Sequence, residues 1–108
     1  MKANLSQKDF EKNVAGSTLT LIQFKTEWNG ACQIIAPLYE DLANVYAGSV
    51  NFFLLDIEKE KNIAHKYRIT ELPTILFFKQ GEVIDHVMGL SPKSSIIAKI
   101  EAALSTNN

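Results

Sequence analysis

The sequence has very little cysteine: Cys32 is the only one in 108 residues. A single thiol excludes an intramolecular disulfide and any metal site built from several cysteines. No apolar run approaches the roughly 20 residues that a membrane-spanning helix requires. The first residues also lack the apolar stretch of a secretory signal peptide. We therefore expect a cytoplasmic protein with no membrane association.

The sequence also has no excess of charge of either sign. Eleven basic and twelve acidic residues give a formal net charge of −1, and no basic block or stripe occurs. The sequence thus gives no electrostatic indication of nucleic-acid binding. His65 and His86 have no metal-ligand spacing to another candidate, so both are expected at the surface. We expect no metal, no cofactor and a monomer made of a single domain, residues 1–108.

What the chain does contain is an alternation of buried-strand and amphipathic-helix patterns. Apolar strand-like runs occupy 19–24, 50–57 and 75–78, and 82–88 follows as a returning strand. Helical patterns occupy 7–14, 34–47, 58–67 and 92–104. Helices between the first strands favour parallel pairing, and the last two strands form an antiparallel hairpin. The order predicts an α/β fold with a central mixed sheet of four or five strands flanked by four helices.

Several helix boundaries carry their own signals. Ser6 and Asp9 have the spacing of a capping box that starts the first helix. Ser91 followed by Pro92 predicts a cap residue and a proline at the first position of the last helix. Pro37 lies inside the long second helix, which we expect to kink there and continue.

The segment Trp28-Asn29-Gly30-Ala31-Cys32 joins the first strand-like run to the second helix. A strand that turns through glycine into a helix exposes backbone N–H groups, which favour phosphate or thiolate. Asparagine is among the best N-cap residues, so we interpret Asn29 as a helix cap rather than a catalytic group. Cys32 is either a small packed thiol or a monothiol that forms mixed disulfides, and the sequence leaves both interpretations open.

With these features the chain resembles the thioredoxins from about Phe10 to Leu104. The landmarks are Phe24, Trp28-x-Gly-x-Cys32, Pro37, Tyr67-Arg-Ile69, Leu72-Pro73-Thr74, Phe77-Phe78-Lys79-x-Gly81 and Met88-Gly89. The resemblance implies the thioredoxin fold. It also implies descent from thiol-disulfide oxidoreductases that act in cell redox homeostasis.

Three departures from the family pattern concern the chemistry. The family motif Trp-Cys-Gly-Pro-Cys reads Trp28-Asn29-Gly30-Ala31-Cys32 here, so Asn29 replaces the attacking cysteine and Cys32 stands at the resolving position. Gln23 replaces the family's buried aspartate, and Leu54 replaces the lysine that partners it. We expect Gln23 to be a buried, hydrogen-bonding amide. Lys25 could point inward and lower the pKa of the Cys32 thiol, but we expect a solvated lysine. Reduction of a disulfide needs one thiol to attack and a second to release the product, so the resemblance implies a degenerate active site.

Pro73 matches the proline that has a cis peptide bond in thioredoxins, beside backbone groups that bind an extended peptide. The other positions of the family's apolar peptide groove correspond to Trp28, Ile57, Leu72, Met88 and Gly89. The resemblance therefore implies a groove that binds a peptide or protein partner without a nucleophile. Two alternatives stay open: Cys32 is a monothiol that reacts with glutathione or a partner protein, or the domain is a purely structural interaction module.

Overall fold

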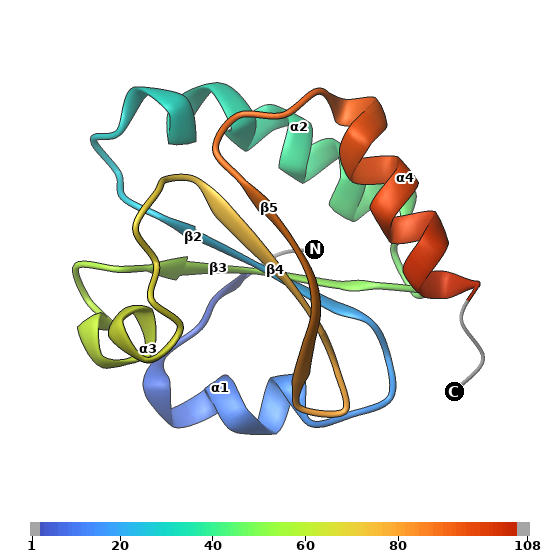
Figure 1. The fold of residues 1–108 in the computed structure, drawn as a ribbon, viewed down its shortest axis with the longest axis horizontal. Helices are drawn as coiled ribbons and strands as arrows, with labels where there is room; N and C mark the ends of the chain where they lie inside the picture. Colours follow the sequence, from blue (N-terminus) through green and yellow to red (C-terminus); the bar gives the residue numbers. More distant parts are fainter. Residues whose placement is uncertain (1–2, 106–108) are drawn as a thin grey trace.

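The computed structural model describes residues 3–105. Its elements follow one another in the order β1 (Ala3–Asn4), α1 (Gln7–Val14), β2 (Thr20–Lys25), α2 (Gly30–Val45), β3 (Asn51–Asp56), α3 (Lys61–Lys66), β4 (Thr74–Lys79), β5 (Glu82–Met88) and α4 (Lys93–Leu104). The strands form one sheet in the order β1-β3-β2-β4-β5 (Figure 1). Among these residues no helix combines the length and the apolar character needed to cross a membrane.

The sheet is mixed, as the sequence predicted. Strand β3 pairs in parallel with β1 and β2, whereas β4 pairs antiparallel with β2 and β5. The register places Lys25 opposite Asp56, Phe24 opposite Thr74, and Thr74 opposite Met88. The carboxyl ends of β2, β3 and β5 therefore meet the amino end of β4 at one edge of the sheet.

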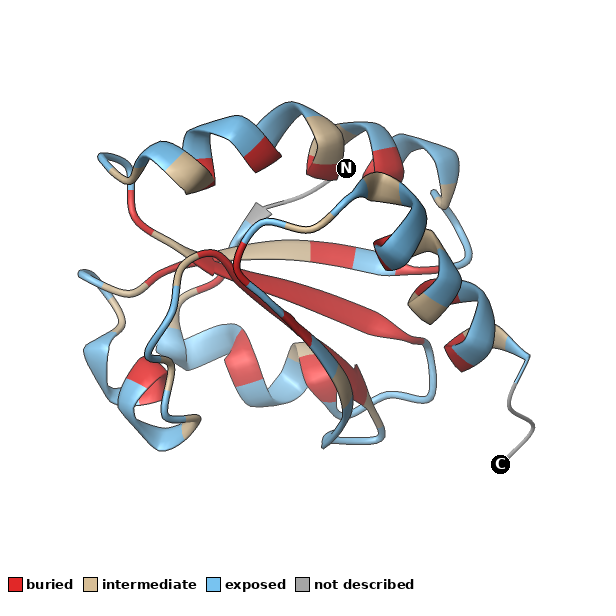
Figure 2. Ribbon diagram, turned by 45° about the horizontal axis from the view of Figure 1, so that its top comes forward, coloured by how far each residue is buried: buried red, intermediate tan, exposed pale blue. Residues whose placement is uncertain are grey.

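Helices cover both faces of the sheet. Helices α2 and α4 lie on one face, and α1 and α3 lie on the other (Figure 1). Each face has its own apolar cluster, one around Tyr39, Phe77 and Ile96 and the other around Phe10, Phe24 and Phe78. The buried positions of each helix face the sheet (Figure 2). The central strands are buried from both sides, which explains why 19–24 and 75–78 are largely apolar in sequence.

Two helix boundaries differ from the sequence prediction for local reasons. Helix α2 begins at Gly30, four residues before the expected Ile34, because Asn29 caps it directly. Helix α3 begins at Lys61 rather than Glu58, because Asp56 organises a turn first. The Asp56 carbonyl oxygen accepts from the N–H of Glu60, and its carboxylate accepts from the N–H of Glu58 at 2.9 Å.

Two capping predictions are wrong in detail. Ser6 does occupy the N-cap of α1, but its hydroxyl donates to the Asp9 carboxylate at 3.2 Å instead of capping the backbone. Pro92 is itself the N-cap residue of α4, because its ψ of 149° is extended, and the helix begins at Lys93. The prediction that α2 continues past Pro37 is confirmed.

Candidate functional site

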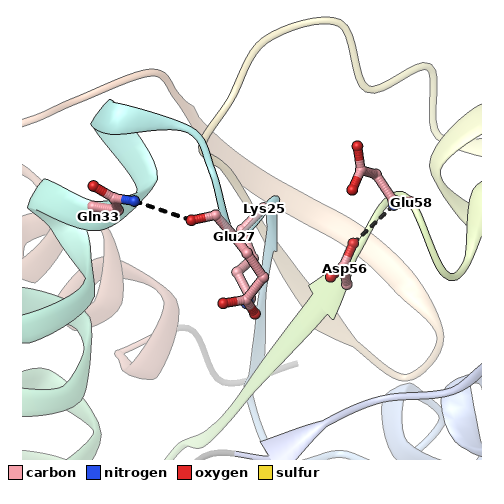
Figure 3. A network of polar contacts seen from close by, with 5 residues as sticks. All are labelled: Lys25, Glu27, Gln33, Asp56 and Glu58. Carbon is pink, nitrogen blue, oxygen red and sulfur yellow. Dashed lines mark hydrogen bonds and ion pairs between the residues drawn. The ribbon is translucent and has the colours of Figure 1, made fainter.

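The candidate site lies at the edge where β2 and β3 end and β4 begins. Strand β2 stops at Lys25, and the loop 26–28 leads into α2. Gln33 in the first turn of α2 donates from Nε2 to the Glu27 carbonyl oxygen at 3.1 Å, which fixes the loop against the helix (Figure 3).

Asn29 is the N-cap of α2, as the sequence predicted. Its backbone is extended, with φ −77° and ψ 127°, and its Oδ1 accepts from the Cys32 N–H at 2.9 Å. Its carbonyl oxygen also accepts from the Gln33 N–H at 3.0 Å. The side chain therefore satisfies one of the N–H groups that a helix start leaves unpaired.

Cys32 lies in the first turn of α2, and only 4% of its surface is exposed. Burial raises the pKa of the Cys32 thiol. A hydrogen bond with the Thr26 backbone and the positive charge of Lys25 oppose that rise without cancelling it. A reactive cysteine needs access and thiolate character, and Cys32 has little of either.

Lys25 is not the solvated lysine that the sequence suggested. Its side chain is 13% exposed, and its ammonium group pairs with the Glu27 carboxylate. In the sheet register Lys25 lies opposite Asp56, where β2 and β3 end. Its positive charge opposes the rise in the pKa of the Cys32 thiol.

Gln23 is buried, as expected, but it is not fully hydrogen-bonded. Within residues 3–105, its Nε2 and the Thr26 hydroxyl are both buried without a partner. Together with Cys32 and Leu54 they line a cavity of about 180 Å³. A small cavity therefore lies beside the thiol, and two of the residues that line it carry buried polar atoms without a partner among the described residues.

Trp28 is held by a contact that the sequence analysis missed. Its indole is 66% exposed, and Nε1 donates to Glu58 Oε2 at 2.9 Å. In sequence Glu58 stands beside Lys59 and Lys61, a pattern typical of a solvated charged surface. The available signal was its place two residues after the end of β3, at the same edge of the sheet as Trp28.

Pro73 and Gly89 are joined directly, because the Gly89 N–H donates to the Pro73 carbonyl oxygen at 2.7 Å. The Leu72–Pro73 peptide bond is cis. Gly89 has φ +76°, and a Cβ there would collide with the Glu71 carboxylate. Among the described residues, the Leu72 N–H and C=O have no hydrogen-bond partner.

The remaining groove candidates lie at the same edge of the sheet but do not line one common cleft. Met88 is 53% exposed and borders a hollow of about 180 Å³, while the half-buried Ile57 borders another of about 540 Å³ beside α3. His65 and His86 are exposed, as predicted. Within residues 3–105 no three His, Cys, Asp or Glu side chains are grouped to hold a metal ion.

Comparison with known proteins identifies the family. The protein-family model described as Thioredoxin matches residues 1–102. The chain belongs to the thioredoxin family. It is 35% identical over 100 residues to the thioredoxin of Staphylococcus saprophyticus, with 93% of this chain and 95% of that protein covered.

Two further thioredoxins bear on the comparison. A chloroplastic M-type thioredoxin of Pisum sativum is 39% identical over 98 residues, which cover 90% of this chain and 57% of the pea protein. The solved structure of the Malassezia sympodialis thioredoxin Mala s 13 superposes with a TM-score of 0.89 at 30% identity, covering 96% of this chain and 94% of that one. The thioredoxin fold expected from sequence is confirmed.

Proposed function

We propose that this thioredoxin-family protein binds an extended segment of a protein partner at the edge around Pro73 and does not run the two-cysteine reduction cycle. The observation that carries the proposal is the Asn29 cap. The residue at the attacking position has its side-chain oxygen bonded to the Cys32 N–H, and a carboxamide has no nucleophilic or redox chemistry.

The cycle requires two thiols in succession. The first attacks the disulfide of the substrate, and the second attacks the resulting mixed disulfide and releases the product. Here only the second position holds sulfur. Cys32 is also buried and, because burial raises its pKa, protonated at neutral pH. A first attack by Cys32 therefore lacks an accessible thiolate.

Support for binding comes from what stays open at the same edge. Trp28 and Met88 expose large apolar surfaces, and tryptophan and methionine are enriched at protein interfaces. The unpaired N–H and C=O of Leu72 suit main-chain hydrogen bonds to an extended segment. Exposed apolar side chains and open backbone groups at the same edge favour recognition over chemistry.

The monothiol alternative makes a different prediction about Cys32. It requires a mixed disulfide with glutathione or a partner, and a side chain with 4% exposure offers a bulky disulfide little access. The alternative of a purely structural module requires that Trp28 and Met88 contribute to no partner contact. Both alternatives are decided by the experiments below.

A disulfide-reduction assay tests the proposal. Insulin and dithiothreitol are mixed with the protein, and precipitation of the reduced insulin B chain is followed by turbidity, with a two-cysteine thioredoxin as positive control. We expect the rate of dithiothreitol alone. Intact-mass spectrometry after oxidised glutathione should show no adduct on the folded protein. Clear turnover, or a glutathione adduct on Cys32, would contradict the proposal.

A further inference from the structure

The apolar edge around Pro73 carries two carboxylates fixed on its own residues. Glu58 Oε2 is bonded to the Trp28 indole N–H at 2.9 Å. The Glu71 carboxylate covers the face of Gly89 on which a side chain would project. One carboxylate thus lies beside Trp28 and another beside Gly89, two residues that this surface would present to a partner.

Within residues 3–105, neither of these carboxylates lies in an ion pair. Ion pairs do join Lys25 to Glu27, Lys93 to Asp41 and Lys99 to Asp85. Lys25 is therefore already paired, and Asp56 adds a further carboxylate at the end of β3 (Figure 3). Glu58 and Glu71 are both exposed, so their charges face the solvent from which a partner arrives.

Basic side chains near this end of the molecule lie on the α3 side. Lys61, His65 and Arg68 line the hollow of about 540 Å³ beside α3, and Arg68 also lines, with His86 and Met88, the hollow of about 180 Å³. The Trp28 side of the surface is acidic, and the α3 side is basic. A bound segment therefore meets opposite charges at its two borders.

From this arrangement we propose that the Pro73 edge selects an extended peptide in which an apolar residue that packs on Trp28 is flanked by lysine or arginine. The inference rests on the proposed binding function and adds the class of partner. The apolar side chain packs on Trp28. The flanking basic group pairs with Glu58 or Glu71, which would otherwise lose solvent on binding without gaining a partner.

Fluorescence of Trp28, the only tryptophan, reports binding directly at this surface. Three blocked eight-residue peptides are titrated, identical except for lysine, glutamine or glutamate on both sides of a central leucine. We expect the lysine peptide to bind about three- to tenfold more tightly than the glutamine peptide, since two exposed charge pairs contribute modestly. The glutamate peptide should bind most weakly, and 0.5 M salt should reduce these differences.

Glutamine variants identify the responsible groups. Glu58→Gln keeps a hydrogen-bond acceptor for the Trp28 indole but removes the charge, and Glu71→Gln removes the charge beside Gly89. Together they should abolish the preference for lysine. Glu82→Gln, at the opposite end of β5, is the matched control and should leave the preference unchanged.

The outcomes separate this inference from the function on which it rests. Equal affinity for all three peptides overturns the charge selection but leaves peptide binding standing. Tighter binding of the glutamate peptide overturns the proposed selection of basic residues and indicates that the basic side chains of the α3 hollow decide the affinity. No change in Trp28 emission with any peptide contradicts both, as does sedimentation showing that a second copy of the chain occupies this surface.

Discussion

Replacing Asn29 with alanine removes the side-chain oxygen that accepts from the Cys32 N–H at 2.9 Å. The loss of such a cap typically destabilises a protein by about 1 kcal/mol. Asn29 is partly exposed, so water can solvate the freed N–H, and the loss should not reach the upper end of the range. For a domain of this length, about 1 kcal/mol corresponds to a melting temperature lower by about 4 °C.

Thermal and urea unfolding followed by far-UV circular dichroism measure this change. Asn29→Asp keeps an acceptor at the cap and should stay within about 0.5 kcal/mol of the parent protein. Asn44→Ala is the matched control, because Asn44 is an exposed position in the last turn of α2, where alanine is the better helix former. If Asn29→Ala is as stable as the parent, or if Asn44→Ala loses as much, the capping argument fails.

Three further predictions concern the same edge. Gly89→Ala should destabilise the fold by about 1 kcal/mol or more, because φ is +76° and the new Cβ meets Glu71; the double variant with Glu71→Ala should recover only part of the loss in urea unfolding. Burial raises the pKa of the Cys32 thiol, so the folded protein keeps that proton to higher pH than the unfolded chain does. Its stability should fall as pH rises above the ordinary thiol value of about 8.5, and less so in Cys32→Ala, when unfolding is measured at pH 7 and pH 10. Glu58→Ala removes the acceptor of the Trp28 indole, so iodide should quench Trp28 emission more strongly than in the parent; unchanged quenching would show that the contact does not hold the ring.

Periodicity and capping chemistry predicted much of this fold. The apolar runs 19–24 and 75–78 became β2 and β4 because both faces of the sheet are covered. The asparagine before Gly30 became a cap because its side chain acts on N–H groups within its own helix turn. These features depend on residues close in sequence.

Contacts between distant residues were not predictable in the same way. Trp28 pairs with Glu58, and the Glu71 carboxylate lies where a Cβ of residue 89 would project. Both contacts depend on strand ends that meet only after the sheet forms. The unpaired Nε2 of Gln23 was also unforeseen, since an amide in a strand does not show in sequence whether its surroundings supply an acceptor.

The most direct test of the central claim is the insulin-reduction rate of Asn29→Cys beside that of the parent protein. The substitution returns a thiol to the N-cap of α2, where the helix dipole favours thiolate, with Cys32 three residues along to resolve the mixed disulfide. We predict turnover above the dithiothreitol background for Asn29→Cys, and none for the parent or for Asn29→Cys combined with Cys32→Ser. Equal rates for the parent and Asn29→Cys would contradict the claim that residue 29 decides whether this surface only binds or also reduces.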